Sequence, residues 1–368
     1  MRVAIDARKL HDGGIGTYIR GLVGALAATP GKDEWTALLE PAHLGRVRWG
    51  GNVHEAGVRA GKYSIAEHFA VPRAARSVHA ELLHSPHYTL PLGWGGPAVV
   101  TIHDLIHVRF AHLHRPGTGL YARAMAGLAA RKAAVVIADS EATRRDVLEL
   151  LGVPAAKVHV VPLGVSPALK PVPAADLAVF RSDRQLPAQY VLYVGARKRH
   201  KNLELLLRAW GVMRPGERPP LVLSGLPWDD DAPLARLARR LGVERSIGFS
   251  GALPDDASLA CLYSGAALVA QPSLAEGFGL PPLEALACGV AVLSSDAGSL
   301  PEVLGDCAVY RPPRDPEAWA HEVLGLLNDG GLRTTLGARG RVRAATFTWA
   351  RTAQMTRALY DEALGRKP

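Results

Sequence analysis

The chain has 368 residues, of which 48% are hydrophobic and 21% are charged. This length fits two domains better than one small module, and no apolar run approaches the roughly 18 residues of a membrane span. Lysine and arginine number 43 against 34 acidic residues, a net charge of +9, which favours anionic partners such as nucleotides, phosphorylated substrates or an acidic membrane surface. Composition therefore indicates a folded chain and argues against a membrane-spanning protein.

Neither export nor disulfide chemistry is indicated. The first strand-like residues, 3–6, follow the initial Met-Arg directly, without an apolar stretch of signal-peptide length. The three cysteines, Cys261, Cys288 and Cys307, are odd in number and form no C-x-x-C pair. We therefore expect buried thiols in a cytoplasmic protein rather than a disulfide framework or a zinc ribbon.

Short β-branched runs alternate with helix-period segments through both halves of the chain. The predicted strands of the first half are 3–6, 36–39, 81–84, 98–103, 133–139 and 158–163. Those of the second half are 190–194, 221–224, 247–250, 266–270, 290–294 and 308–310. Helical periodicity separates many of them, including 15–28, 140–151, 203–213, 233–241 and 282–288. This alternation predicts an α/β chain with two doubly wound parallel sheets.

A proline-rich segment, residues 166–189, has no clean periodicity and predicts a linker. It would join Rossmann-like domains at 1–165 and 190–345, which would face each other across a cleft at the carboxyl ends of their strands. Beyond residue 345, apolar residues recur at helical spacing from Phe347 to Tyr360. We expect residues 346–368 to form a helix that docks near the domain junction and crosses back to the first domain.

Glycines recur shortly after the first predicted strand, at Gly13, Gly14 and Gly16. Glycine lets the backbone approach a ligand closely, and the free amides of a helix start attract a phosphate. The spacing is not G-x-G-x-x-G, and no acidic residue follows at the distance of a nicotinamide-fold ribose contact. A tight strand-to-helix turn and a phosphate-contacting turn therefore both stay open.

A second glycine-rich segment, residues 276–289, carries two glutamates, Glu276 and Glu284. Pro282 suits the first helical position and Gly289 the residue past the helix end. The amides of that helix would suit a diphosphate, with one carboxylate near sugar hydroxyls and the other near a ribose. Complementation of the helix dipole, worth about 0.3–1 kcal/mol, is an alternative role for Glu284 but not for Glu276.

This E-x7-E arrangement, with its GFGLPPLEALACG run, resembles the retaining glycosyltransferases of family four. The resemblance covers nearly the whole chain, in matching order and spacing. Its further segments are DGGIGTYIRGL, HSPHYTLPL, VVTIHDLIHVRF, ADSEATRRDVLELLGV, VHVVPLGV, YVLYVGARKRHKNLELLLRAW and FTWARTAQMTRALY. It implies the two-domain GT-B fold and metal-independent transfer of a hexose from a nucleoside diphosphate sugar to a hydroxyl, with retention of configuration.

The resemblance also implies roles for single residues. Arg197 and Lys201 look like the basic pair that grips the donor diphosphate, although many members place the arginine directly after the glycine. Glu276 resembles the carboxylate on the donor sugar, and Glu284 the one on the nucleotide ribose. His103 resembles the first-domain histidine beside the donor sugar. The remaining donor-binding positions are Gly13, Gly14, Gly16, Gly195, Ser250, Gly251, Phe278, Gly279 and Leu280.

Some of these proposed roles have a purely structural alternative. A solvated basic turn would account for at least one residue of 197–199, and a core or strand-end histidine for His103. The histidines of 103–114 and the aspartates of 229–231 do not form a recognised metal motif, so we expect no metal. No cofactor is expected beyond the donor substrate.

Only the resemblance narrows the identities of the donor and the acceptor. HSPHYTLPL and the HKN motif resemble bacterial mannosyltransferases and related deoxyhexosyltransferases of surface polysaccharide synthesis, which makes GDP-mannose the first choice. A UDP-sugar for glucosyl or N-acetylhexosaminyl transfer stays open, because residues 250–253 do not distinguish the bases. The expected acceptor is a glycan or a polyprenyl-diphosphate-linked sugar. A nucleotide-sugar epimerase and a catalytically silent partner subunit are alternatives, and nucleic-acid binding lacks any supporting motif.

A one-sided charge distribution marks the first half. Residues 105–138 contain no aspartate or glutamate. The candidate acceptor or membrane surface consists of Arg73, Arg109, Arg115 and Arg123. Such a surface could hold a lipid-linked diphosphate at an anionic membrane, with the protein peripheral at its inner face. A solvated helix face explains the same charges equally well.

Overall fold

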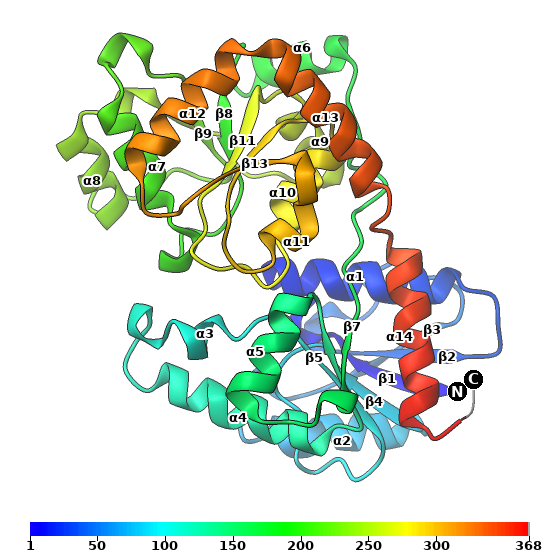
Figure 1. The fold of residues 1–368 in the computed structure, drawn as a ribbon. Coiled ribbons are helices and arrows are strands. Elements are labelled where there is room, and N and C mark those ends of the chain that lie inside the picture. Colours follow the sequence, from blue (N-terminus) through cyan, green and yellow to red (C-terminus); the bar gives the residue numbers. More distant parts are fainter. Residues whose placement is uncertain (367–368) are drawn as a thin grey trace. The chain divides into compact units, whose positions relative to one another are not determined.

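The computed structural model describes residues 1–366 and divides into two compact units (Figure 1). Unit 1 comprises Met1–Gly164 together with the C-terminal residues from Phe347 onward, and unit 2 comprises Val165–Thr346. Residues 166–189, predicted as a linker, are counted with unit 2. They contain a helix, α6 (Ala174–Asp183), which the proline content had hidden.

Unit 1 is built on a seven-stranded parallel sheet in the order β3-β2-β1-β4-β5-β6-β7. Its strands are β1 (Arg2–Asp6), β2 (Glu34–Leu39), β3 (Val53–Gly57), β4 (Leu82–Ser85), β5 (Ala98–Ile102), β6 (Val135–Ala138) and β7 (Val158–Val160). Strands β4, β5 and β6 are buried along their whole length, which is why they read as continuous apolar runs. Strand β3 was not predicted, because this edge strand is half exposed and contains His54 and Glu55.

Helices cover the sheet of unit 1. They are α1 (Gly13–Ala28), α2 (Glu67–Ser77), α3 (Ile106–Arg109), α4 (Thr118–Lys132), α5 (Glu141–Leu151) and α14 (Trp349–Ala363). Helix α5 begins at Ser140, whose side chain accepts from the Thr143 amide at 3.0 Å, and ends at Gly152 with φ +63°.

The C-terminal helix returns to unit 1, as predicted. Helix α14 packs along α1, and the Trp349 ring lies so close to Gly21 that a Cβ there would come within 2.2 Å of it. Farther along α14, the Tyr360 hydroxyl lies 2.7 Å from Nδ1 of His84 on β4. The apolar spacing after residue 345 is therefore explained by burial against α1 and the sheet.

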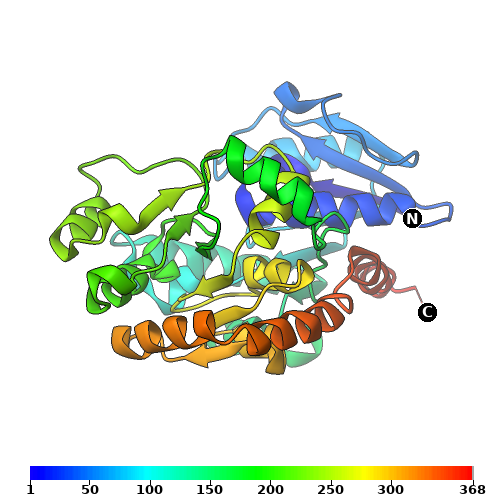
Figure 2. The ribbon, with the colours of Figure 1, turned by 90° about the horizontal axis from the view of Figure 1, so that it is seen from above.

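Unit 2 is built on a six-stranded parallel sheet in the order β10-β9-β8-β11-β12-β13. Its strands are β8 (Val191–Tyr193), β9 (Leu221–Leu223), β10 (Ile247–Phe249), β11 (Leu268–Gln271), β12 (Val292–Ser295) and β13 (Val309–Arg311). Its helices besides α6 are α7 (Leu203–Val212), α8 (Pro233–Leu241), α9 (Asp256–Ser264), α10 (Leu280–Ala287), α11 (Leu300–Leu304), α12 (Pro316–Asn328) and α13 (Gly330–Ala344). Helices α12 and α13 follow one another along one side of this unit (Figure 2).

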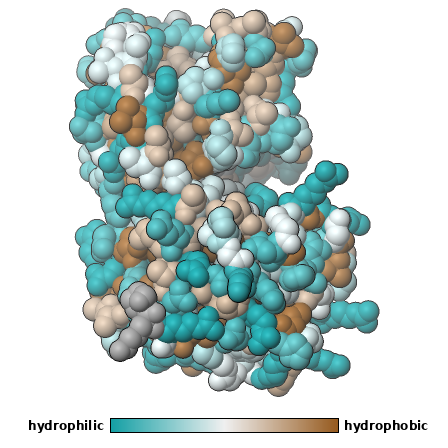
Figure 3. Space-filling model, turned by 90° about the vertical axis from the view of Figure 1, so that its right-hand side faces the viewer, coloured by the Kyte–Doolittle hydropathy of each residue, from teal (hydrophilic) through white to brown (hydrophobic). Residues whose placement is uncertain are grey.

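Single-turn 3₁₀ segments connect several of these elements. They are η1 (Ala7–Lys9), η2 (Pro41–His43), η3 (Ala111–Leu113), η4 (Ala155–Lys157), η5 (Arg199–Lys201), η6 (Pro215–Glu217), η7 (Glu244–Ser246) and η8 (Gly305–Cys307). Within residues 1–366, no helix combines the length and apolarity that a bilayer crossing requires. The face shown in Figure 3 intersperses hydrophilic side chains with small hydrophobic patches.

Both sheets have a point at which the strand order reverses direction. In unit 1 this point lies between β1 and β4, and in unit 2 between β8 and β11. Ligands of open parallel sheets bind outside the carboxyl ends of the strands at such a point, because the loops diverge there and leave room. The loops that follow β1, β4, β8 and β11 are therefore the places to look for a site.

Candidate active site

Lys201 and Glu276 form a close ion pair at the strand-order reversal of unit 2. The Lys201 Nζ lies 2.8 Å from Oε1 and 2.7 Å from Oε2 of Glu276. Lys201 ends η5, which follows β8, and Glu276 stands in the loop after the adjacent strand β11. The two side chains are 18% and 6% exposed. These two predicted site residues, 75 positions apart in the chain, thus lie together, and their charges neutralise each other.

Three residues that the sequence analysis missed hydrogen-bond to Glu276, and a fourth, Gly298, leaves room for its backbone. Its Oε1 accepts hydrogen bonds from Gln271 Nε2 at 2.9 Å and Ser273 Oγ at 2.7 Å, and its backbone oxygen accepts from the amide and hydroxyl of Ser299. A Cβ on Gly298, whose φ is +61°, would lie 2.5 Å from that backbone oxygen. Gln271 and Ser273 could have been noticed as polar residues at the end of a buried strand. Gly298 and Ser299 carry no local signal.

Helix α10 begins two residues earlier than predicted, at Leu280, after Gly279 in a left-handed conformation with φ +94°. Its two prolines, Pro281 and Pro282, both fit the first turn, where no intrahelical N–H donor is needed. Glu284 therefore lies in the second turn of α10, and not in the first turn where a helix start at Pro282 would have placed it. This weakens the helix-dipole explanation of Glu284, because that effect fades within the first turn.

Glu284 instead belongs to a partly buried polar pair with α9. The Tyr263 hydroxyl donates to Glu284 Oε2 at 2.8 Å. Burial raises the pKa of Glu284 to about 7, although the hydrogen bond from Tyr263 opposes that change. A carboxyl group with this pKa exchanges its proton near neutrality, so a hydroxyl-bearing ligand that donates to it would stabilise the ionised form.

The contacts of Arg197 are with residues other than Lys201 and Glu276. Its guanidinium donates to the Leu226 carbonyl and lies 5.8 Å and 5.5 Å from the ring centroids of Trp228 and Phe249. Its role beside Lys201 as the basic pair on the donor diphosphate stays a prediction. The side chain is exposed, and its contacts are to one carbonyl and two ring faces.

The other predicted donor positions of unit 2 lie in loops at the carboxyl edge of its sheet. Gly195 follows β8, and a Cβ there would lie 3.0 Å from the Tyr193 hydroxyl. Ser250 follows β10 and accepts from the Gly225 amide at 3.1 Å. Gly251 has φ +71°, which explains why glycine stands there. Phe278, with 5% exposure, is buried just before Gly279.

His103 follows β5 in unit 1 and is held from both sides of its ring. Nδ1 lies 2.7 Å from Asp139 Oδ2, and Nε2 lies 3.2 Å from the Pro86 carbonyl oxygen. The Tyr18 ring meets it edge-on at 4.8 Å. Because both ring nitrogens face oxygen acceptors, the doubly protonated imidazolium fits best. Asp139 was missed as a site residue, although it stands at the end of the predicted strand 133–139.

The charge on His103 is set by opposing influences. Burial by itself would lower the pKa of His103. The charge and hydrogen bond of Asp139, the charge of Asp104 and the Pro86 carbonyl together outweigh burial and raise that pKa above its usual value. The nearby His84 behaves in the opposite way: burial, followed by the charge of His103, lowers its pKa to about 3. These surroundings therefore favour the charged form of His103 and the neutral form of His84.

A chain of buried hydroxyls supports the residues around His103. The Tyr18 hydroxyl lies 3.0 Å from Thr101 Oγ1, which lies 2.8 Å from Nε2 of His84. The Tyr360 hydroxyl completes the chain on the other nitrogen of His84. Helices α1 and α14 and strands β4 and β5 are thereby joined. This network fixes the packing behind the site and presents nothing to a ligand.

The glycine-rich turn of unit 1 divides into two parts. A Cβ on Gly16 would lie 2.2 Å from the Leu10 carbonyl oxygen, so glycine is required there by packing. Gly13 and Gly14 open α1, are exposed, and have open space where a Cβ would stand. The tight-turn interpretation thus applies to Gly16, whereas Gly13 and Gly14 keep their amides available to a ligand.

The four candidate surface arginines are not equivalent. Arg73, Arg115 and Arg123 are exposed. Arg109 forms ion pairs with Asp146 and Glu149 of α5 at 2.7 and 2.6 Å. The acid-free stretch 105–138 is thus partly neutralised by acids from another element, which a charge count along the chain could not reveal.

The two segments considered for metal binding have other structural roles. Asp229 and Asp230 lie in a turn, where their carbonyl oxygens accept from the Ala232 amide and the Arg239 guanidinium. The rings of His107 and His114 lie 4.4 Å apart and contact each other. Over residues 1–366 no three His, Cys, Asp or Glu side chains are grouped closely enough to hold an ion.

Comparison with known proteins agrees with this arrangement. Residues 12–169 match the family model described as Glycosyltransferase Family 4, and residues 178–343 match Glycosyl transferases group 1. The chain is 33% identical over 280 residues to the O-antigen chain mannosyltransferase B of Escherichia coli, covering 75% of this chain and 73% of that protein.

Solved structures share the fold. The sucrose-phosphate synthase from Thermosynechococcus elongatus superimposes with a TM-score of 0.80 at 23% identity, over 99% of each chain. Anabaena Alr3699/HepE in complex with UDP-glucose also gives a TM-score of 0.80, at 19% identity, over 98% of this chain and 100% of the other. The chain therefore belongs to the family four glycosyltransferases, has the GT-B fold and is a hexosyltransferase.

Proposed function

We propose that this protein transfers mannose from GDP-mannose to a hydroxyl of a glycan or lipid-linked sugar, with retention of configuration and without a metal ion. The observation that carries the proposal is the Lys201–Glu276 pair at the strand-order reversal of unit 2, braced by Gln271 and Ser273. At this position the Lys201 ammonium can bind the diphosphate of a nucleotide sugar, and the Glu276 carboxylate can bind its sugar hydroxyls.

The chemistry asked of the protein is positioning and charge stabilisation. Lys201 would leave Glu276 and neutralise the departing diphosphate, while the backbone amides of Gly279 and Leu280, which precede the two prolines of α10, bind its oxygens. Glu276, released from Lys201, would accept from the sugar hydroxyls. Retention follows if the departing phosphate oxygen takes the acceptor proton on the face it leaves. His103, as an imidazolium, would stabilise negative charge beside the sugar.

The choice of mannose as the transferred sugar and of guanine as the donor base is supported by sequence resemblance and by the relatives. The HSPHYTLPL and HKN motifs and the similarity to an O-antigen mannosyltransferase support GDP-mannose. A UDP-sugar is the second candidate, favoured by the fold shared with a protein solved with UDP-glucose. A nucleotide-sugar epimerase of similar architecture is the third, and it would convert donor with no acceptor present.

Nucleotide binding tests the donor directly. Thermal unfolding is measured with GDP, UDP, ADP and dTDP, each with EDTA, because a ligand at 100 times its Kd stabilises by about 2.7 kcal/mol. GDP is expected to raise Tm most. In Glu284→Gln the increase in Tm caused by GDP should be smaller, since the amide is a weaker acceptor for the ribose hydroxyls. Without ligand, and at pH values above 7, this variant should have a higher Tm than wild type, which carries an ionised carboxylate there.

The sign follows from the raised pKa of Glu284. Ionising a buried carboxyl group whose folded pKa exceeds its unfolded value costs stability as pH rises from about 4.5 to about 7. The glutamine variant avoids that cost. A UDP-selective shift would replace the donor assignment. An absence of any shift, in wild type and with all four nucleotides, would remove the nucleotide-sugar proposal.

We also propose that unit 1 contacts an anionic membrane. Arg73 is exposed on α2, Arg115 on the loop before α4, and Arg123 on α4. The same two helices and the loops beside them expose large apolar side chains: Ile65, Phe69, Leu92, Leu120, Tyr121 and Leu128. Arginines bind anionic headgroups and apolar side chains enter the acyl boundary, so the combination suits a lipid surface better than charge alone.

Vesicle sedimentation tests this surface. Arg115→Glu/Arg123→Glu is expected to lose at least ten-fold in affinity for vesicles that contain anionic phospholipid. The matched control is Arg46→Glu/Arg48→Glu, which changes net charge equally at two exposed residues of the segment before β3. Equal binding by the two double variants would make the effect one of net charge and would eliminate the specific surface.

A further inference from the structure

Lys9 is a buried cation at the strand-order reversal of unit 1. It ends η1, directly after β1, and is only 7% exposed. Within the described part of the chain its Nζ has no hydrogen-bond partner. Burial lowers the pKa of Lys9 to about 8, so it keeps its charge at neutral pH at a cost. A buried ammonium without an acceptor is rare unless a ligand supplies one.

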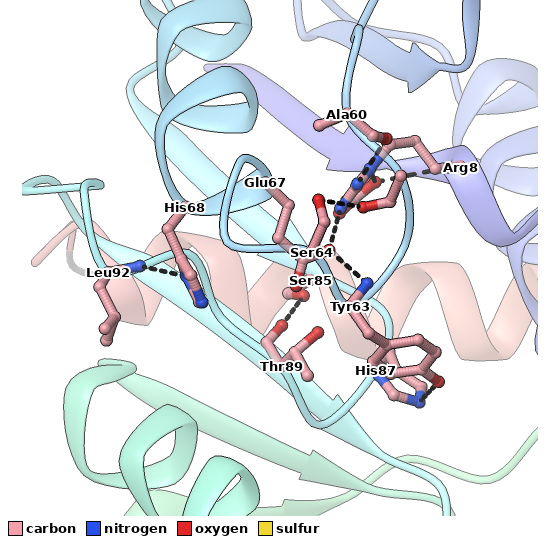
Figure 4. Close-up of polar contacts among 12 residues, drawn as sticks. Arg8, Ala60, Tyr63, Ser64, Glu67, His68, Ser85, His87, Thr89 and Leu92 are labelled. Atoms are coloured by element: carbon pink, nitrogen blue, oxygen red, sulfur yellow. Dashed lines mark hydrogen bonds and ion pairs between the residues drawn. The ribbon is translucent and has the colours of Figure 1, made fainter.

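The acids that face Lys9 are each bonded to another cation. Asp6 and Glu67 both bind the Arg8 guanidinium, at 2.7 and 3.2 Å, and Figure 4 shows Glu67 reaching Arg8 from the start of α2. Asp12 pairs with Lys62 at 2.7 Å. These three acids, with Lys62, are the charged groups that influence Lys9. Lys9 is therefore the cation of this cluster without an oxygen acceptor.

A second donor without an acceptor lies beside it. His87, 5% exposed, follows β4, the strand next to β1. Burial, and then the charge of Lys9, lowers the pKa of His87 to about 2, so the ring is neutral. Its Nε2 lies 3.0 Å from the Tyr63 hydroxyl (Figure 4). When Nε2 accepts from Tyr63, the ring proton sits on Nδ1, which has no partner among the described residues.

Tyr63 contacts both Lys9 and His87. The Lys9 Nζ lies 3.6 Å from the centroid of the Tyr63 ring, so a π face substitutes for an oxygen acceptor. Tyr63 has φ +59°, a left-handed conformation that a tyrosine rarely adopts, and Glu67 holds it there by accepting from its amide at 3.0 Å. Its side chain is 46% exposed. Rotation of this exposed ring would open Lys9 and His87 to a ligand.

This cluster adjoins the proposed reaction centre within the same unit. The carbonyl oxygen that lies within hydrogen-bond distance of His103 Nε2 belongs to Pro86, the residue before His87. Strands β1, β4 and β5 are consecutive in the sheet, and Lys9, His87 and His103 follow them in that order. A group bound by Lys9 and His87 would therefore belong to a molecule that also reaches His103.

We propose that Lys9 and His87 form a subsite for a phosphoryl group of the sugar acceptor, which the Tyr63 ring covers when no acceptor is bound. The proposal rests on the proposed function in that it describes the acceptor of that transfer. Two adjacent donors without acceptors fit a group that only accepts, such as a phosphoryl oxygen, better than a hydroxyl that must also donate. The phosphoryl group belongs either to a lipid diphosphate or to a soluble sugar phosphate.

Phosphate binding to the full chain tests the subsite. Inorganic phosphate and pyrophosphate are titrated calorimetrically into protein already saturated with GDP, so that the donor site is occupied. Lys9→Met should weaken phosphate binding at least ten-fold, with a Tm equal to or above that of wild type, because a buried unpaired charge is removed. The control Lys32→Met, an exposed residue of unit 1, should change affinity less than two-fold.

The results separate the subsite from the proposed function. Equal phosphate affinity in wild type and Lys9→Met overturns the subsite whether or not GDP binds. Failure of GDP to bind removes the donor proposal, and the same titration without GDP still tests Lys9. If Lys9→Met fails to fold, Lys9→Gln is used, and unchanged affinity in that variant overturns the subsite.

A vesicle arm identifies the source of the phosphoryl group. Vesicles with phosphatidic acid are compared with vesicles of phosphatidylcholine alone as competitors of inorganic phosphate. Competition by the first in wild type but not in Lys9→Met supports a lipid-borne phosphoryl group. Lys9-dependent phosphate binding without vesicle competition supports a soluble sugar phosphate.

Discussion

Lys201→Met is expected to lower kcat about 10²–10³-fold, the loss typical of removing one donor that stabilises developing negative charge. Lys201 is the cation within reach of Glu276, at 2.7 Å, so no neighbouring side chain replaces its charge at that carboxylate in the part of the chain that the structure describes. The measurement is single-turnover transfer from GDP-mannose. Lys198→Met is the matched control, because Lys198 is exposed in the same loop. Turnover near the wild-type value would remove Lys201 from the site.

The same substitution should also destabilise the fold. It leaves Glu276, 6% exposed, without its counter-ion, and breaking a buried pair in this way costs about 3 kcal/mol. Lys201→Met/Glu276→Gln should recover much of that stability, since no unpaired charge remains, yet stay inactive. Chemical denaturation of wild type and the two variants separates a folding defect from a catalytic one. A double variant that regained activity together with stability would contradict the assigned role.

Asp139→Asn is expected to lower kcat/KM about 10–100-fold at neutral pH, because the carboxylate that keeps His103 protonated and oriented is lost. The asparagine side chain is nearly isosteric but uncharged. Removing the charge lets burial dominate and lowers the pKa of His103. Activity that depends on charged His103 would therefore fall at a lower pH in the variant. The measurement is the pH profile of kcat/KM.

Stability should follow the same titration. A histidine with a raised folded pKa contributes stability that is fully present below the unfolded value of about 6.5 and is lost as pH rises through the folded value. The stability gap between wild type and Asp139→Asn should thus be larger near pH 6 than near pH 9. His103→Gln has no group to titrate at this position. If kcat/KM of His103→Gln still decreases at high pH, another residue is responsible for that decrease.

Local patterns predicted the framework because they depend on short-range physics. Each predicted strand overlaps an observed one, since buried parallel strands need continuous apolar residues. Strand β3 escaped because an exposed edge strand tolerates polar residues. The start of α10 was placed two residues late because the prolines were noticed and the left-handed Gly279 was not.

The sequence by itself determined the family and the two parallel sheets, since the residues that encode them lie in contiguous segments, and it supplied the candidate site residues. Only the tertiary structure decided which side chains meet. It paired Lys201 with Glu276, bonded Arg197 to the Leu226 carbonyl, paired Asp139 with His103 and left Lys9 without an acceptor beside His87. These facts depend on contacts between strands far apart in the chain, and on burial, which removes water as an alternative partner.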